Sequence, residues 1–228
     1  MKTLGIIPAR AGSKRVARKN VRDFCGKPLI SWTIECARQA SALDAIVVSS
    51  DDQDALLLAR SFEGIIALPR PPEIATDTAP AVGYVKHALD VLPGAADVDT
   101  IVILQPTSPL RLPSDIDATV ALLADPTADS AVSTVLVAHD VHPLKMKTLR
   151  DGRLLPYVEE ERGRMMAHEL DAIYVRNCAV YATRRRVIES GQIIGNDCRS
   201  FEMPRERSVD INDEIDFELA ELLMKKRR

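Results

Sequence analysis

Short apolar segments alternate with helical patterns through the first 138 residues, and this alternation restricts the fold more than any other feature. Segments 4–7, 45–50, 65–68, 100–104 and 130–138 are apolar or β-branched, as strands are. Segment 100–104 (Thr-Ile-Val-Ile-Leu) does not alternate with polar residues, which is typical of a strand buried on both faces. The pattern predicts an α/β fold with a mostly parallel sheet and helices on both faces.

Helix signals lie between and after these strands. Asp51 and Asp52 are good caps for a helix that runs to Phe62, and Ser114 or Asp115 is expected to cap another. The remaining expected helices are Pro28–Ala37, Ala81–Leu92 and Glu214–Lys226.

The alternation of strand and helix patterns ends after Ala138. Lys145–Leu149 and Arg153–Val158 flank Asp151-Gly152, which is a strong hairpin signal, and Ala172–Thr183 is β-like. This part does not repeat the strand–helix unit. We therefore expect one domain over residues 1–228, with 139–180 forming an inserted arm or lobe that extends to another subunit.

Composition limits the partners and the compartment. The 228 residues and 46% hydrophobic content suit one large domain, and the net charge of −3 gives no reason to expect nucleic acid or an anionic membrane as a partner. There is no signal-peptide core and no apolar run long enough to cross a bilayer. The four cysteines form no C-x-x-C pair, so we expect free thiols in the cytoplasm and no zinc.

The first strand leads into a basic loop, residues 10–19. Its five cations are Arg10, Lys14, Arg15, Arg18 and Lys19. Gly12 stands alone, so the loop is neither a P-loop nor a three-glycine dinucleotide fingerprint. Five charges of one sign repel one another unless an anion neutralises them. Phosphates bind at this edge of open α/β sheets, which favours a nucleotide site over a loop that merely solubilises the fold or touches nucleic acid.

Two further polar loops follow strands. Residues 104–111 (Leu-Gln-Pro-Thr-Ser-Pro-Leu-Arg) place Gln105 and other neutral donors beside Arg111, which suits a hydroxylated, carboxylated substrate. Taken alone, an ordinary polar turn explains this loop as well. In the other loop, residues 70–79, Arg70 and Asp77 are expected either to read a base or ribose or to pair with each other.

Carboxylates gather in residues 208–214 (Ser-Val-Asp-Ile-Asn-Asp-Glu). In an extended stretch Asp210 and Asn212 point the same way, and a carboxylate near a triphosphate suits Mg²⁺. The alternative is that Asn212 or Asp213 caps the last helix. Both hold if Asp210 binds metal while Asn212 or Asp213 caps.

Together these motifs resemble the acylneuraminate cytidylyltransferases, which are the CMP-sialic acid synthetases and their relatives for other nonulosonic acids. The matching segments occur in family order and cover nearly the whole chain. They are residues 7–14 with Lys19-Asn20, 70–71 with 75–79, 104–111, 142–145, and 208–211 with 216–221.

The resemblance implies a Rossmann-like nucleotidyltransferase fold and a homodimer in which the inserted lobe reaches toward the partner's site. It implies Mg²⁺-dependent reaction of CTP with a 2-keto-3-deoxy sugar acid, giving a CMP-sugar and pyrophosphate. The implied catalytic residues are Arg10, Lys19 and Asp210, and the metal would be held by Asp210 and Asn212. The residues expected to bind CTP are Arg10, Gly12, Ser13, Lys14, Lys19, Asn20, Arg70 and Asp77. Those expected to bind the sugar acid are Gln105, Lys145, Asn177 and Tyr181.

The chain departs from the family pattern mainly on the sugar side. Ala81 stands where many relatives have serine, Cys178 replaces a usual glycine, and Asn212 replaces an acid seen in some relatives. Two arginines expected near the sugar appear as Ala167 and Val175. Two alternatives stay open: a cytidylyltransferase for 3-deoxy-octulosonate, and a CTP-binding homologue that has lost synthesis.

Overall fold

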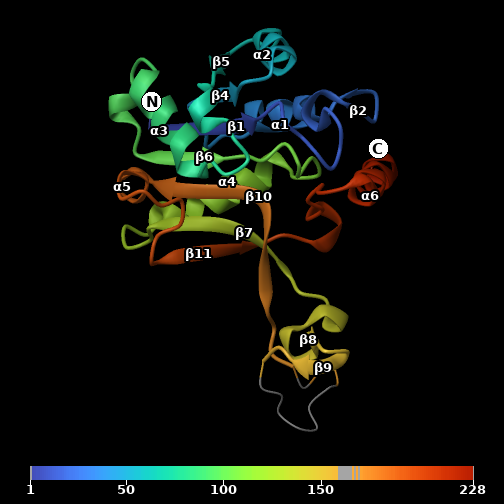
Figure 1. Ribbon diagram of the computed structural model, residues 1–228. Coiled ribbons are helices and arrows are strands. Elements are labelled where there is room, and N and C mark those ends of the chain that lie inside the picture. Colours follow the sequence, from blue (N-terminus) through green and yellow to red (C-terminus); the bar gives the residue numbers. More distant parts are fainter. Residues whose placement is uncertain (1, 159–165, 167, 169, 228) are drawn as a thin grey trace.

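A seven-stranded sheet forms the centre of the computed structural model, which describes residues 2–158, 166, 168 and 170–227 (Figure 1). Its strands are β1 (Thr3–Ala9), β4 (Ala45–Ser50), β5 (Ile65–Pro69), β6 (Thr100–Ile103), β7 (Ser130–Leu136), β10 (Tyr174–Arg184) and β11 (Cys198–Glu202). They lie in the order β11-β7-β10-β6-β1-β4-β5. Only β10 runs antiparallel to its two neighbours within this sheet, so the expected mostly parallel sheet is confirmed.

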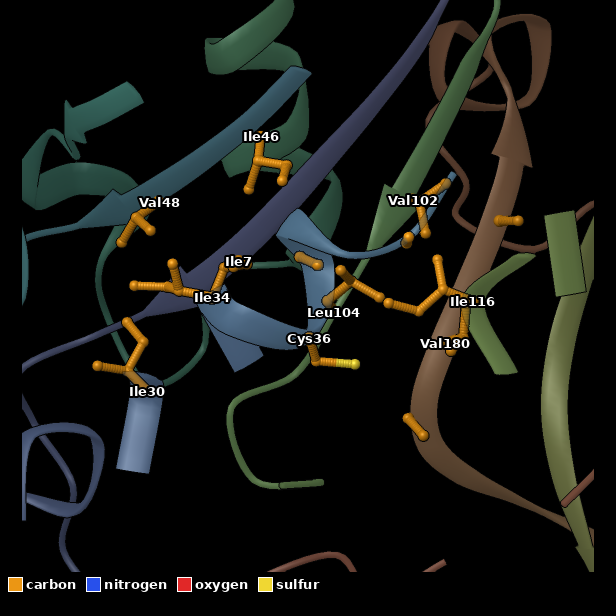
Figure 2. Packing of buried hydrophobic residues seen from close by; sticks show 14 of the residues in the cluster. Ile7, Ile30, Ile34, Cys36, Ile46, Val48, Val102, Leu104, Ile116 and Val180 are labelled. Atoms are coloured by element: carbon orange, nitrogen blue, oxygen red, sulfur yellow. The ribbon is translucent and has the colours of Figure 1, made fainter. Parts of the chain in front are cut away.

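Helices cover both faces of the sheet, as expected. The α-helices are α1 (Leu29–Arg38), α2 (Gln53–Arg60), α3 (Ala81–Val91), α4 (Pro113–Ala121), α5 (Arg185–Glu189) and α6 (Glu214–Arg227). Side chains alternate along β1: Leu4 and Ile6 pack in one core cluster with α3, whereas Ile7 packs in the other with α1. Figure 2 shows Ile7 beside Ile34 of α1 in that second cluster.

Short 3-10 turns occupy several connections. They are η1 (Lys19–Val21), η2 (Pro72–Ile74), η3 (Ala95–Asp97), η4 (Leu122–Ala124), η5 (His139–Val141), η6 (Pro143–Lys145) and η8 (Arg205–Arg207). In the part of the chain that the structure describes, no helix has the length and apolar character needed to cross a bilayer.

One expected cap is confirmed and another is wrong. Asp52 accepts a hydrogen bond from the Asp54 N–H at 2.9 Å and caps α2. For α4, Pro113 takes the first helical position, so the helix begins before the expected caps. Asp115 instead lies in the first turn and accepts a hydrogen bond from the Leu112 N–H at 2.8 Å.

The predicted hairpin forms outside the main sheet. It consists of β8 (Lys147–Arg150) and β9 (Arg153–Pro156), joined by Asp151 and Gly152 at φ values of 49° and 75°. The expected lobe, residues 139–180, includes the first part of β10, which pairs with β7 inside the sheet. We call the segment between β7 and β10, residues 137–173, the arm. Figure 1 shows the hairpin projecting away from the sheet.

A third apolar cluster brings the C-terminal segment to the basic loop. Phe217 of α6 packs edge-to-face on Phe24, with ring centroids 5.4 Å apart. Phe24 belongs to a two-stranded ribbon, β2 (Asp23–Phe24) and β3 (Lys27–Pro28). Ile211 and Val16 are buried in the same cluster. This packing places residues 208–213 beside the loop that follows β1.

Candidate functional site

A cleft with a volume of about 490 Å³ lies where the loops after β1, β5 and β6 meet. Many of the predicted site residues line it: Arg10, Ser13, Lys14, Lys19, Asn20, Arg70, Asp77, Gln105 and Asn212. Other predicted residues do not line it: Gly12, Lys145, Asn177, Tyr181 and Asp210. The carboxyl edge of the sheet therefore gathers the cationic residues and Gln105, as the sequence predicts.

Two cations of the basic loop share one carboxylate. The Arg10 guanidinium forms an ion pair with one oxygen of Asp77, and Lys14 Nζ lies 2.5 Å from the other oxygen. Hydrogen bonds from Lys14 and Arg10 hold the pKa of Asp77 at about 2. Asp77 does not pair with Arg70, so that alternative for the 70–79 loop is wrong.

Lys19 and Asn20 connect the basic loop to its surroundings. Lys19 Nζ donates a hydrogen bond to the carbonyl of Ile211 at 2.7 Å. Burial lowers the pKa of Lys19, and the nearby Asp210 carboxylate partly offsets this. The buried Asn20 side chain donates to the Arg10 carbonyl at 3.1 Å and fixes the start of the loop.

Arg70 is buried under the cleft rather than exposed in it. Its Nη2 donates to the Ser49 carbonyl at 2.8 Å and its Nε to Ser49 Oγ at 3.2 Å. The guanidinium carbon lies 4.6 Å from the centre of the Tyr84 ring. Ala81 lines the same wall, where the resemblance places the nucleoside.

Tyr84 is a cleft residue that the sequence analysis missed. Its hydroxyl is buried without a hydrogen-bond partner among the described residues, and burial raises its pKa. In sequence it reads as an apolar position of α3. The sequence could have indicated that Tyr84 lines the cleft, because Tyr84 lies three residues after Ala81 and therefore on the same face of the helix.

The carboxylates before α6 divide between two tasks. Asp213 Oδ1 accepts a hydrogen bond from the Asp216 N–H at 3.0 Å, and Asp216 Oδ2 accepts one from the Asn212 N–H at 2.8 Å. These two acids cap the helix. Asp210 takes no part in the cap, and its Oδ2 accepts a hydrogen bond from Asn212 Nδ2 at 3.2 Å. The residues therefore allow capping by Asp213 together with metal binding by Asp210.

Asp210 and Asn212 suit a metal ion that arrives with phosphates. A carboxylate oxygen and an amide oxygen are hard donors of the kind Mg²⁺ prefers. Within the described residues, no group of three or more His, Cys, Asp or Glu side chains is placed to hold a metal by itself. Oxygens from a polyphosphate would complete the ligand set.

A bulge in β10 lies next to Asp210. The pairing of β10 with β7 shifts between Arg176 and Tyr181, and Cys178 within the shift has φ of +61°. The Tyr181 hydroxyl donates to Cys178 Sγ at 3.3 Å. Burial raises the pKa of the Cys178 thiol and of the Tyr181 hydroxyl, so both are neutral at pH 7.

Asn177 does not fit the direct sugar contact expected of it. Its side chain is buried and its Oδ1 accepts a hydrogen bond from Ser133 Oγ at 2.6 Å. Its Nδ2 donates to Ser208 Oγ at 2.9 Å and to the thioether sulfur Sδ of Met203 at 3.3 Å. Asn177 thus ties β10 to β7 and to the segment that leads to Asp210.

Two further predicted residues lie away from the cleft. Gly12 is exposed, and a Cβ there would meet only Arg10 Nη1 at 3.9 Å, so the space does not require glycine. Lys145 lies in the arm, where its Nζ is 2.8 Å from His139 Nε2. Ala167, one of the departures from the family pattern, lies outside the described residues.

Comparison with known proteins decides the family. A family described as "Cytidylyltransferase" matches residues 4–203, which is most of the chain. The chain belongs to the cytidylyltransferase family. The match ends before Asp210, so the carboxylates ahead of α6 lie beyond it.

Named relatives align with this cytidylyltransferase along its length. An N-acylneuraminate cytidylyltransferase of Escherichia coli is 30% identical over 99% of this chain, but the chain spans only 53% of that relative. A CMP-N,N'-diacetyllegionaminic acid synthase of Legionella pneumophila is 32% identical, covering 98% of this chain and 97% of the relative. A pseudaminic acid cytidylyltransferase of Campylobacter jejuni is 30% identical, covering 99% of this chain and 97% of the relative.

A solved structure supports the expected nucleotidyltransferase fold. A CMP:2-keto-3-deoxy-manno-octonic acid synthetase, solved with CTP, superposes with a TM-score of 0.75 over 100% of both chains. It is 18% identical in sequence, so the likeness concerns the fold.

Proposed function

We propose that this cytidylyltransferase transfers CMP from CTP to a nonulosonic acid of the sialic type. The anomeric hydroxyl of the sugar acid would attack the α-phosphorus of CTP, and pyrophosphate would leave. The observation that carries the proposal is the cleft itself, which brings Arg10, Lys14 and Lys19 of the basic loop together with Arg70 and Gln105 from two other loops. The three relatives compared above are named for reactions of this kind.

The cations support the chemistry of phosphoryl transfer. Such a transfer needs positioning and charge neutralisation more than it needs a covalent intermediate. Arg10 and Lys19 enter the cleft from the two ends of the basic loop. We assign them to neutralise the charge that grows on the phosphate oxygens, with Lys14, Ser13 and Asn20 binding the triphosphate.

Arg70 and Ala81 form the wall we assign to the cytidine. Because Arg70 is held by Ser49 and Tyr84, its guanidinium is fixed before a nucleotide arrives. The hydroxyl that a serine would offer at position 81 is absent from this wall.

We assign Mg²⁺ to Asp210, with Asn212 as a second oxygen donor. When bound, the ion would neutralise phosphate charge and lower the pKa of the attacking hydroxyl. We expect Asp210→Ala to raise the Mg²⁺ concentration that gives half-maximal activity by about tenfold or more. Activity assayed over a Mg²⁺ titration measures this, and an unchanged titration curve would remove Asp210 as a ligand.

For the sugar acid we assign Gln105 and Tyr181 from the same subunit and Lys145 from a partner. Lys145 lies in the arm and does not line the cleft of its own chain. A homodimer in which each arm reaches the other subunit's cleft would bring Lys145 to a site. Val175 and Cys178, which depart from the family pattern, lie in β10 together with Tyr181.

The surface of the arm supports a dimer. Leu149 and Leu154 of its hairpin are 71% and 70% exposed. Further exposed apolar side chains along the arm and the strand ends that carry it are Leu136, Val141, Met146, Leu155, Tyr157, Met166, Tyr174 and Val175. Apolar surface gathered in this way marks an interaction site. The described cysteines form no disulfide, which agrees with the cytoplasmic compartment we propose.

A pyrophosphate-release assay tests the function. The protein is incubated with CTP, Mg²⁺ and one acid at a time: N-acetylneuraminic, legionaminic, pseudaminic and 3-deoxy-octulosonic acid. We expect release with at least one of the first three acids. Release with the octulosonic acid alone would contradict the proposed substrate class. Binding of CTP in calorimetry without release for any acid would show a nucleotide-binding homologue instead.

A further inference from the structure

Asp77 is the one carboxylate among the described residues that line the cleft, and five cations line the same cleft. Those cations are Arg10, Lys14, Arg15, Lys19 and Arg70. Both oxygens of the Asp77 carboxylate are engaged, one by Arg10 and one by Lys14. An anion thus already neutralises two of the basic-loop cations that the proposed function assigns to the triphosphate.

We propose that Asp77 is a displaceable anion, which competes with polyphosphate for Arg10 and Lys14 and thereby weakens the binding of both CTP and pyrophosphate. The inference rests on the proposed function for its biological meaning, but the competition itself concerns any polyphosphate. It gives Asp77 a role opposite to the nucleotide-binding one expected from the sequence.

The Asp77 carboxylate and a phosphate would repel each other if both were bound to Arg10 and Lys14. A phosphate that approached Arg10 with Asp77 in place would meet the carboxylate at hydrogen-bonding distance. Phosphate oxygens form charge-assisted bonds to guanidinium and ammonium groups as a carboxylate does, and a polyphosphate offers more of them. Polyphosphate binding is therefore expected to release Asp77 rather than to include it.

The position of Asp77 makes release easy. It lies between η2 and α3, in a loop segment, and its side chain is 41% exposed. Exposed ion pairs contribute little stability, so exchanging them for bonds to phosphate needs little energy. Since Arg10 and Lys14 hold the pKa of Asp77 at about 2, the carboxylate stays charged at every working pH.

The consequence for turnover lies mainly in product release. A carboxylate tethered beside the site returns to the cations as pyrophosphate leaves, without having to diffuse there. Asp77 would thus lower the affinity for substrate triphosphate and for product pyrophosphate together, and shorten the time that the product stays bound.

Binding of inorganic tripolyphosphate, measured by calorimetry without nucleotide, tests the competition directly. We expect Asp77→Asn to bind it about threefold to tenfold more tightly than the unaltered protein at low ionic strength. The difference should shrink as salt rises, because the charges are exposed. In turnover assays, pyrophosphate should inhibit Asp77→Asn at lower concentration.

Asp54→Asn is the matched control. Asp54 forms an ion pair with Arg18 of the same basic loop, on an exposed surface outside the cleft. Like Asp77→Asn, this variant removes one negative charge from beside the basic loop. Its affinity for tripolyphosphate should stay within about twofold of that of the unaltered protein. An equal gain in both variants would mean that net charge alone acts, which would overturn the specific role of Asp77.

The outcomes separate this inference from the proposed function. Unchanged or weaker tripolyphosphate binding by Asp77→Asn overturns the competition, even if the enzyme turns over CTP normally. Tighter binding by Asp77→Asn, with no CTP turnover for any acid, supports the competition and contradicts the proposed function.

Discussion

At the scale of single residues, Cys178 has a backbone conformation that suits glycine better than cysteine. Its φ of +61° lies in the left-handed region, where a side chain is strained by about 1–2 kcal/mol. The strain occurs at the bulge in β10, between the buried Asn177 and the half-buried Tyr181. The bulge lets a buried strand deliver Tyr181 and Cys178 next to Asp210.

Cys178→Gly should therefore raise the free energy of unfolding by about 0.5–1 kcal/mol, after the lost sulfur contacts are subtracted. Urea unfolding of both proteins measures the change. Cys198→Gly is the control, because Cys198 lies in β11 with no positive φ and should lose stability. If the two variants lose stability alike, strain at Cys178 is contradicted.

Lys19 is the residue on which the proposed chemistry depends most. Lys19→Ala should lower kcat/KM for CTP by about 100-fold or more, because a partly buried cation at the phosphates is removed. Steady-state kinetics measures the loss, and circular dichroism checks the fold.

Arg18→Ala is the neighbouring control. Arg18 pairs with Asp54 and does not line the cleft, so kcat/KM should stay within about threefold. Near-normal activity of Lys19→Ala, or equal losses in both variants, would show that the basic loop is misassigned.

At the scale of elements, Arg111 joins the loop after β6 to the β10 bulge. Its guanidinium is buried and donates to the carbonyls of Ala179 and Gln105 and to Thr33 Oγ1. Burial lowers the pKa of Arg111 to about 10, which leaves it charged at pH 7. In sequence Arg111 reads as a substrate cation, whereas its place in the fold makes it a positioning residue for Gln105.

Arg111→Met should lower the free energy of unfolding by about 2–4 kcal/mol, because the buried carbonyls of Ala179 and Gln105 lose their donor. Urea unfolding measures this. Arg199→Met is the control: Arg199 makes exposed ion pairs with Asp125 and Asp197, and its loss should cost less than about 1 kcal/mol. Equal costs would contradict the structural role of Arg111.

At the scale of the whole molecule, the proposal that each arm serves the other subunit's cleft can be tested with mixed dimers. If Lys145 serves the partner's cleft, a mixture of Arg10→Ala and Lys145→Ala proteins should regain activity. Random heterodimers would each contain one intact site, so a mixture unfolded and refolded together should reach about a quarter of the unaltered activity.

A mixture of Arg10→Ala and Lys19→Ala gives the matched control. Both residues line the cleft of their own chain, and Lys145 is intact in both variants. A heterodimer of these two variants would contain an intact site only if Arg10 and Lys19 acted in different subunits. We expect no recovery in this control. Recovery in the control, or none in the Lys145 mixture while dimers form, would contradict an arm that acts between subunits.

The parallel part of the sheet, the helices between its strands and the hairpin could all be predicted from the amino-acid sequence, and so could the composition of the basic loop. These depend on neighbouring residues: apolar runs form buried strands, and Asp-Gly forms a tight turn. The predicted range 45–50 agrees with β4 because both ends of that strand are marked locally. Sequence also placed Arg10, Lys19, Arg70 and Gln105 at one edge, since parallel strands end together.

The partners of these side chains could not be predicted in this way, because they depend on how the whole chain folds. Asp77 lies 67 residues from Arg10, and Lys19 lies 192 residues from Ile211, so no local pattern records either contact. The burial of Asn177 and the entry of β10 between β6 and β7 likewise depend on long-range pairing. Such contacts form because packing of the whole chain brings distant segments together, and that information is spread over every element that packs.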